Sequence, residues 1–327
     1  MNSALDIFYF LMQQTMIFAI PLLIVAIGGM FSERSGVINI ALEGIMIIGG
    51  FSGILFINIF QKYVPDNSIF SGQFLLIMAI IISALAGAIF SLLHAFASIN
   101  LKADQTISGT ALNLFAPAFA IYVARLIQST QQIPFKDSFR IAQVPILSKI
   151  PIIGQILFKD VYITTYLGLI IALISYIAIN KTKFGIRLRA CGEYPQAADS
   201  VGINVYKIRY AGVILSGILA GIGGLIFVIP TSTNFNGSVA GYGFLALAVL
   251  IFGQWRTPKI LIAALFFGIM KTLSSSYSIV PILKNLNISN EIYKMIPYIA
   301  TLIILVIFSK NTNAPKSAGI PYDKSVR

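Results

Sequence analysis

The sequence predicts an all-α polytopic membrane protein with about nine or ten transmembrane helices, some of them broken, and a short cytoplasmic coupling helix. Hydrophobic residues make up 57% of the 327 residues and charged residues only 10%, whereas a soluble domain averages about 25% charged residues. The apolar residues also gather into runs of roughly 20, the length that spans a bilayer as a helix. Such a chain cannot cover a water-facing surface with polar side chains.

Eight apolar stretches follow one another along the chain, and the seventh is divided into two shorter pieces. They cover residues 7–30, 37–60, 73–97, 105–127, 161–180, 209–229, 242–254 with 258–277, and 293–309. Residues 1–309 therefore form the predicted transmembrane domain, with residues 181–209 as a cytoplasmic loop. Residues 310–327 form a polar cytoplasmic tail that we expect to be disordered.

The charges predict the orientation. Residues 181–209 hold six basic and two acidic residues, and residues 310–327 hold four basic and one acidic residue. Because loops rich in Lys and Arg stay in the cytoplasm, both segments are predicted to lie inside and residues 128–160 outside. The N-terminus is predicted to lie outside if SERSG, residues 32–36, is a true inner loop. The net charge of +12 then reflects topology. No nucleic-acid partner is expected, since no basic platform with interleaved aromatic residues is present.

Two segments leave the number of crossings open. The stretch SERSGVINIALEG, residues 32–44, reads either as an inner loop or as a break between half-helices inside the membrane. The stretch PILSKIPIIGQILF, residues 145–158, either stays outside or dips back into the membrane. Non-helical backbone at membrane depth is tolerated where it is buried in protein or lines a cavity, as it does in many transporters.

The first candidates for a substrate path are Asn39 and Glu43. They are four residues apart, so we expect them to share a helix face. A carboxylate between two apolar runs is costly unless it faces a polar path or a partner. The alternative for Glu43 is a helix-end ion pair or cap near Arg34.

The next span offers three more polar candidates, Thr106, Thr110 and Asn113, at a spacing that places them on one helix face. They either hydrogen-bond a polar solute or hold a neighbouring helix. Asp104 and Gln105 are predicted to begin this helix.

Residues 235–255, FNGSVAGYGFLALAVLIFGQW, predict an outer loop that enters a short or broken helix. Tyr242 and Phe244 either stack on a flat ligand or serve as interfacial anchors. In the preceding span, SGILAGIGGL at residues 216–225 places three glycines on one face, where they allow close helix packing.

Other features argue against chemistry in this chain. His94 is the only histidine, and with no second ligand beside it we expect a packed, hydrogen-bonded side chain rather than a metal site. Cys191 is the only cysteine, so no intrachain disulfide forms. The chain has no P-loop and no nucleophile–base signature, so we predict no catalytic residue, no metal and no cofactor of its own.

The charged stretch of residues 184–210 contains EYPQAADSVG, in which Pro195 is suited to begin a short helix and Gly202 to end it. A helix of about two turns between two membrane spans suits docking into a groove of another protein. The alternative is a solvated loop whose basic residues only fix the topology.

The segment GEYPQAADSVGI resembles the cytoplasmic coupling segment of ABC-transporter permeases. It holds the A-A-x-x-x-G core of that loop at Ala197, Ala198 and Gly202, with a glutamate upstream at Glu193, as is typical of the branched-chain amino acid and ribose permease group. The segments ERSGVINIALEGIMIIGGF, ADQTISGTALNL, SGILAGIGGL and GYGFLALAVLIFGQW resemble, in order, those of bacterial nucleoside ABC permeases. The resemblance covers about residues 7–309.

The resemblance implies the permease subunit of an ATP-driven importer of nucleosides, in the bacterial cytoplasmic (inner) membrane. It also implies an ABC ATPase that binds ATP and Mg²⁺, a second, paralogous permease in a heterodimer, membrane lipid around them and an extracytoplasmic substrate-binding lipoprotein. The alternatives are a permease for ribose-like sugars or branched-chain amino acids, or an ion-gradient-driven carrier or channel. The residues implied to couple to the ATPase are Arg189, Glu193, Pro195, Ala197, Ala198 and Gly202.

Overall fold

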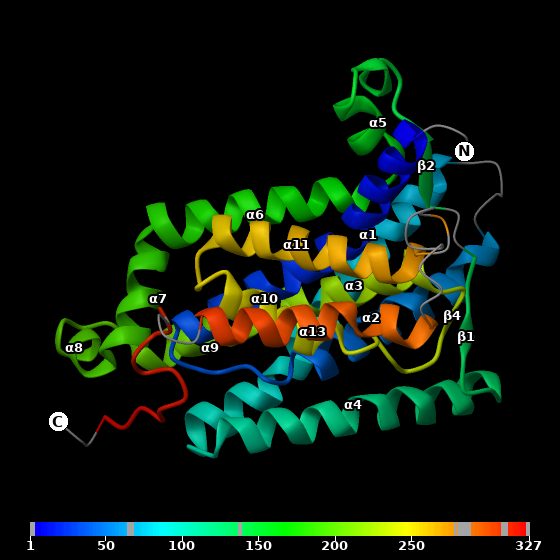
Figure 1. Ribbon diagram of the computed structural model, residues 1–327. Helices are drawn as coiled ribbons and strands as arrows, with labels where there is room; N and C mark the ends of the chain where they lie inside the picture. The colour runs from blue at the N-terminus through cyan, green and yellow to red at the C-terminus, as the bar shows by residue number, and fades with distance from the viewer. Residues whose placement is uncertain are drawn as a thin grey trace.

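The computed structural model describes residues 4–63, 69–136, 139–277, 279, 289–308 and 313–324. The long helices are α1 (Ala4–Arg34), α2 (Leu42–Phe60), α3 (Ile69–Ala95, continued by the π-helical turn Phe96–Asn100), α4 (Gln105–Gln128), α6 (Ile163–Lys181), α9 (Val205–Thr231), α10 (Tyr242–Phe252), α11 (Thr257–Ser276) and α13 (Asn290–Phe308). They form one elongated bundle (Figure 1).

The predicted all-α membrane fold is confirmed. Within the described residues, seven helices are long and apolar enough to span a membrane: α1, α2, α3, α4, α6, α9 and α11. Each of the nine predicted segments corresponds to one of the long helices. The prediction of two short pieces after residue 242 is wrong for the second piece, because α11 has 20 residues and is long enough to span by itself. α10, with 11 residues, is the shortest of the nine helices named above.

The bundle has a buried centre and two exposed edges. In α1 and α9, 89% and 83% of the most apolar window is buried, against 33% in α6 and 17% in α4. Figure 1 shows α6 and α4 along opposite edges of the bundle. A polytopic protein turns such apolar edges toward lipid or toward another chain.

Gly221 of α9 lies where α9 packs closely against both α2 and α3. A Cβ atom at Gly221 would lie 2.2 Å from the carbonyl oxygen of Ser83 in α3, and one at Gly49 in α2 would lie 2.3 Å from the Gly221 Cα. Added Cβ atoms at Gly217 and Gly224 would clash with α3 and α2 in the same way. The packing role predicted for the three glycines is confirmed.

One end of the bundle, which the charge pattern predicts to face outside, carries several small elements. It is called the outer end below, and the opposite end is called the inner end. β1 (Ile133–Pro134) pairs with β4 (Asn234–Phe235), and β2 (Arg140–Gln143) pairs with β3 (Lys159–Tyr162), both antiparallel. Between β2 and β3 lie η3 (Leu147–Lys149) and α5 (Ile153–Leu157), which extend beyond the bundle (Figure 1). Another short turn, η1 (Gln61–Tyr63), follows α2. Residues 145–158 contain only these two short turns of helix, and among the described residues they add no helix long enough to span a membrane.

The opposite end carries α7 (Lys183–Glu193), α8 (Pro195–Ser200) and the chain's C-terminal segment (Figure 1). The two predicted cytoplasmic segments thus share one end, and the N-terminus and residues 128–160 share the other.

The predicted disorder of the tail is wrong for residues 313–324, which pack against the inner end. The Ser317 N–H donates to the Gly192 carbonyl oxygen at 2.8 Å, and Arg209 Nη1 donates to the Ile320 carbonyl oxygen at 3.0 Å. The tail is polar overall, but its backbone finds partners and Tyr322 is 4% exposed. Residues 310–312 and 325–327 lie outside the described residues.

Candidate functional site

The connection between α1 and α2, residues 35–41, is not helical and lies buried in the bundle. Side chains from other helices satisfy its backbone. The Gln105 side chain of α4 accepts the Ile38 N–H at 2.7 Å, and His94 Nε2 of α3 lies 2.8 Å from the Ile38 carbonyl oxygen. His94 is therefore the packed, hydrogen-bonded side chain that was predicted. Without these partners, freed backbone groups would be too costly at this place.

Asn113 of α4 holds the end of the same connection. Its side chain donates to the Ile40 carbonyl oxygen at 2.9 Å and accepts the Gly44 N–H at 2.8 Å. Asn113 thus holds the neighbouring helix α2, which is one of the two predicted alternatives. The other alternative, a hydrogen bond to a polar solute, stays a prediction.

The break lies well within the bundle. Asn39 Nδ2 donates to the Ser216 hydroxyl at 2.9 Å. Ser216 follows the start of α9 at Val205 by eleven residues, about 16 Å along the helix axis. The structure therefore favours a break inside the membrane over an inner loop. Since α2 begins at Leu42, Asn39 precedes it, and the predicted shared helix face of Asn39 and Glu43 is wrong.

Glu43 caps the N-terminus of α10. Its Oε1 accepts the Gly241 N–H at 2.9 Å and its Oε2 accepts the Gly243 N–H at 2.6 Å. The Phe244 N–H also bonds to this carboxylate. A carboxylate is stabilised there by the unpaired N–H groups and the positive end of the helix dipole. The predicted alternative, a helix cap, is therefore observed on a helix far along the sequence and not near Arg34.

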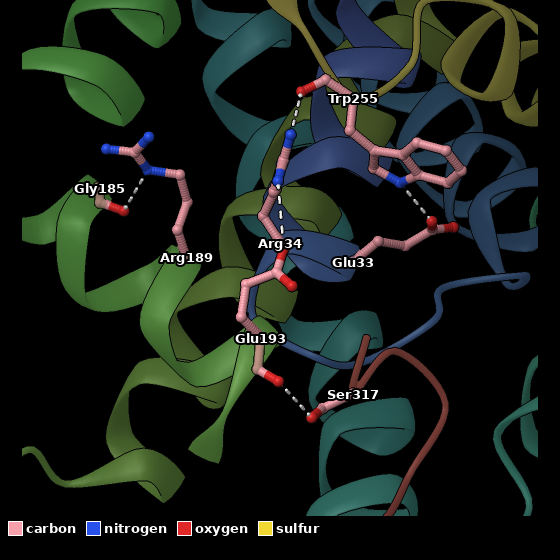
Figure 2. A network of polar contacts seen from close by, with 7 residues as sticks. All are labelled: Glu33, Arg34, Gly185, Arg189, Glu193, Trp255 and Ser317. Carbon is pink, nitrogen blue, oxygen red and sulfur yellow. Dashed lines mark hydrogen bonds and ion pairs between the residues drawn. The ribbon is translucent and has the colours of Figure 1, made fainter. Parts of the chain in front are cut away.

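The other end of α10 is held by Glu33, from the last turn of α1. The indole Nε1–H of Trp255 donates to Glu33 Oε2 at 2.6 Å (Figure 2), and Glu33 is 7% exposed. Gln254 and Trp255 both have positive φ angles, 50° and 54°, which are strained for non-glycine residues. The two glutamates that flank the break therefore hold the two ends of α10.

Sequence reasoning missed Glu33. The available signals were a second glutamate beside the break and the single tryptophan of the chain. Neither signal pairs the two residues, which are 222 positions apart.

The two aromatic candidates differ in their surroundings. Tyr242 is 1% exposed, and its ring lies 3.9 Å, between centroids, from the ring of Phe227. Its ring therefore packs against the protein, and its stacking on a ligand stays a prediction. Phe244, two residues further along α10, is by contrast 51% exposed.

Thr106 and Thr110 lie on the exposed side of α4. The Thr110 hydroxyl donates to the Thr106 carbonyl oxygen at 2.8 Å. Asp104 caps this helix by accepting the Thr106 and Ile107 N–H groups, so the predicted helix start is confirmed. The seven path candidates thus divide into a buried group (Asn39, Glu43, Tyr242 and the half-buried Asn113) and an exposed group (Thr106, Thr110, Phe244).

The inner end presents the predicted short helix. Pro195 occupies the first turn of α8, the helix ends before Gly202, and Gly202 has a φ angle of +83°. Ala198 is buried, whereas Ala197 is exposed together with Tyr194 and Val201. An apolar exposed surface therefore lies on and beside α8.

A polar network joins α7 to the end of α1. Arg34 Nη1 lies 3.8 Å from Glu193 Oε1, and Arg34 Nη2 donates to the Trp255 carbonyl oxygen at 3.1 Å (Figure 2). The Ser317 hydroxyl donates to the Glu193 carbonyl oxygen at 3.1 Å. Arg189 Nε donates to the Gly185 carbonyl oxygen, within α7, at 3.4 Å.

The tail links α8 to the break. Tyr322 packs in one cluster with Cys191, Ala198 and Val205. Three residues earlier, the Gly319 N–H donates to the Gly36 carbonyl oxygen at 3.3 Å, at the start of the break.

Cys191 belongs to the interior of this cluster and is fully buried. Burial raises the pKa of its thiol from 9.0 to about 11, so the thiol is neutral at physiological pH. In the described part of the chain, no three His, Cys, Asp or Glu side chains gather as metal ligands.

Comparisons with known proteins give the family. The model of the family described as branched-chain amino acid transport system / permease component matches residues 11–306. The guanosine ABC transporter permease protein NupQ of Bacillus subtilis is 44% identical over 321 residues, 96% of each chain. The nucleoside ABC transporter permease protein NupC of Lactococcus lactis is 41% identical over 315 residues, 95% of each chain.

A second protein of Lactococcus lactis, the nucleoside ABC transporter permease protein NupB, is 25% identical over 325 residues, 94% of this chain and 82% of its own. No solved structure matches this chain.

Proposed function

This chain belongs to the family of permease components of branched-chain amino acid transport systems, and from that premise we propose that it is the membrane subunit of an ATP-driven nucleoside importer. The observation that carries the substrate class is the near-full-length similarity to two proteins named as guanosine and nucleoside permeases. The chain is a multi-pass membrane protein, and we place it in the bacterial cytoplasmic membrane.

The proposed path runs along the exposed group of candidates. Thr106 and Thr110 offer hydroxyls for the hydroxyl groups of a sugar, and Phe244 offers a ring face for a flat base. The buried group of candidates positions α2, α4 and α10 behind them. Because these three side chains lie on the surface of a single chain, a second permease has to close the path.

We propose that the second permease is a paralogue. Lactococcus lactis has two permease proteins named for nucleosides, and they differ widely in their identity to this chain. An extracytoplasmic substrate-binding lipoprotein would deliver the nucleoside from outside.

The apolar surface of α8 is the proposed docking site for a separate ABC ATPase, which would bind ATP and Mg²⁺. Tyr194, Ala197 and Val201 would enter its groove, with Pro195 and Gly202 setting the ends of the helix. Arg189 and Glu193 would position α7 beside it. This chain's residues supply contact and transmission, and ATP hydrolysis belongs to the partner.

The tail is the proposed link from this surface to the membrane interior. Tyr322 packs against Ala198 of α8, and Gly319 bonds to Gly36 at the break. Displacement of α8 would therefore move the start of the break, and with it Arg34 and the Trp255 end of α10 to which Arg34 bonds.

The experiment is uptake of labelled guanosine by cells with and without this chain. It is run with ATP depletion, with a protonophore at constant ATP, and with unlabelled adenosine, ribose and leucine as competitors. We expect uptake that depends on the chain, requires ATP, resists the protonophore and is reduced only by the nucleoside.

Collapse of uptake by the protonophore at constant ATP would favour an ion-gradient-driven carrier. Competition by ribose or leucine would favour the sugar or branched-chain amino acid alternatives. Loss of ATPase co-purification after deletion of residues 195–202, with the chain still inserted in the membrane, tests the docking surface separately.

A further inference from the structure

A basic cavity of about 680 Å³ opens at the inner end of the bundle, beside the α8 surface and apart from the proposed path. It lies between the ends of α1, α6 and α7, the start of α11 and the tail. Its lining includes Tyr176, Asn180, Trp255, Thr257 and Pro258.

Charge in this cavity is unbalanced. Among the described lining residues, Arg34, Arg189, Arg256 and Lys316 face one carboxylate, that of Glu193. Glu193 pairs with Arg34 over 3.8 Å and also attracts Lys316, so one carboxylate serves four cations. The positive-inside rule accounts for basic residues on this side of the membrane, but not for their convergence on one enclosed space.

Arg34 is the buried member of the group, with its side chain 15% exposed. Its Nε has no hydrogen-bond partner although it is buried. Figure 2 shows Arg34 between Trp255 and Glu193, with Arg189 on α7 bonded to Gly185. A buried guanidinium with a free donor is costly unless an acceptor completes it.

The N-terminus of α11 adds to the positive electrostatic potential of this cavity. This helix has 20 residues, begins at Thr257 and has no side-chain cap at its N-terminus. Because Thr257 and Pro258 line the cavity, the positive end of the helix dipole lies at its wall.

We propose that this cavity binds the phosphate of an anionic phospholipid from the inner leaflet. Phosphate is the chemistry that three cations and a free helix N-terminus recognise. The lipid source follows from the neighbouring surfaces: Leu173 and Ile174 of α6 and Ile262 of α11 are exposed and apolar, and they continue from the cavity along the membrane span. Acyl chains would lie along these faces, with the phosphate at the level of the helix ends.

Lys316 connects the cavity to the tail. Its ammonium donates to the Tyr194 hydroxyl at 2.8 Å, and this hydrogen bond raises the pKa of Lys316, so the side chain stays charged. A bound phosphate would therefore also hold the tail against α7.

The test uses the full-length chain purified in detergent and titrated separately with dioleoyl phosphatidylglycerol and dioleoyl phosphatidylcholine. Bound lipid is counted by native mass spectrometry. We expect at least about tenfold tighter binding of the anionic lipid, since each cation near a headgroup phosphate contributes about fivefold. The double variant Arg256→Gln with Lys316→Gln should weaken phosphatidylglycerol binding about 30-fold.

The matched control is Arg187→Gln with Lys207→Gln, which removes one Arg and one Lys that are exposed on the same side and do not line the cavity. It should change binding less than about twofold. Equal binding of the two lipids, or equal losses in the two double variants, would overturn the proposal. Displacement of the lipid by millimolar inorganic phosphate would overturn the lipid source and leave a site for soluble phosphate.

Discussion

The two ends of α10 are held by glutamates in different ways. At the inner end of the bundle, Glu33 accepts one side-chain donor, the Trp255 indole, next to two strained backbone positions. At the N-terminus of α10, Glu43 accepts backbone N–H groups, including those of Gly241 and Gly243, and the break beside it is satisfied by side chains from α3, α4 and α9.

The difference indicates which end is built to be fixed. A Cβ at Gly243 would lie 2.3 Å from the Glu43 backbone nitrogen, so the N-terminus of α10 fits against α2 without room to spare. The Trp255 end is held by strained backbone and by the side chains of Glu33 and Arg34. The tail reaches Arg34 through Glu193. We infer that motion from the cytoplasmic side enters α10 at the Trp255 end and pivots on Glu43.

The largest effect is expected from Glu43→Ala. It leaves the N–H groups at the start of α10 buried without their acceptor, at a cost of about 1–3 kcal/mol each. We expect loss of transport and a markedly lower melting temperature of the purified chain. Glu43→Gln keeps one acceptor oxygen, so its melting temperature should lie between those of Glu43→Ala and the natural chain. A melting temperature for Glu43→Ala equal to that of the natural chain would show that the N-terminus of α10 is not fixed by this residue.

Trp255→Phe should have the next largest effect. It removes the donor to Glu33 while keeping an aromatic ring, and we expect a loss of about 1–3 kcal/mol, below that of Glu43→Ala because one donor is involved. The comparison is made by thermal unfolding of both variants under identical conditions. The conservative control is Glu33→Gln, which keeps an acceptor for the indole. The reverse order of the two losses would contradict the assignment of the fixed end.

Tyr322→Ala acts on the tail and should leave the membrane core intact. We expect hydrogen exchange in α8 and in the start of the break to rise about tenfold, because local opening costs less than global unfolding. The control is Lys324→Ala, an exposed residue of the same segment. Unchanged hydrogen exchange in α8 and at the start of the break in Tyr322→Ala would show that Tyr322 does not connect the tail to the α8 surface.

The smallest effect concerns the Cys191 thiol. Its pKa is raised to about 11 by burial, so the stability it contributes is present below the ordinary value of 9.0 and is lost as the pH rises to about 11. At neutral pH we expect alkylation by iodoacetamide to be far slower than for an exposed cysteine, and faster in Tyr322→Ala. Rapid alkylation in the natural chain would mean that the cluster around Tyr322 opens readily.

The sequence was most informative where the membrane dictates the pattern. Apolar runs predicted the nine helical segments, and Pro195 and Gly202 predicted α8. Helix breaks were harder, because the local pattern of residues 37–44 continues an apolar run while distant side chains such as Gln105 stabilise an irregular backbone.

The tail is a second region where the sequence did not predict the structure. Its composition is that of a disordered segment, yet Tyr322 and a few backbone groups are enough to dock residues 313–324. Pairs such as Glu33 with Trp255 depend on contacts between residues far apart in the sequence. A single sequence does not show which distant residues meet.

The most direct test of the account measures guanosine uptake and ATP hydrolysis in the same proteoliposomes, with the complete transporter reconstituted. The account predicts that Tyr322→Ala hydrolyses ATP at close to the natural rate while uptake falls at least about tenfold, because α8 still binds the ATPase but no longer moves the break. A parallel fall of uptake and hydrolysis, or no change in either, would contradict a link between the docking surface and α10 through the tail.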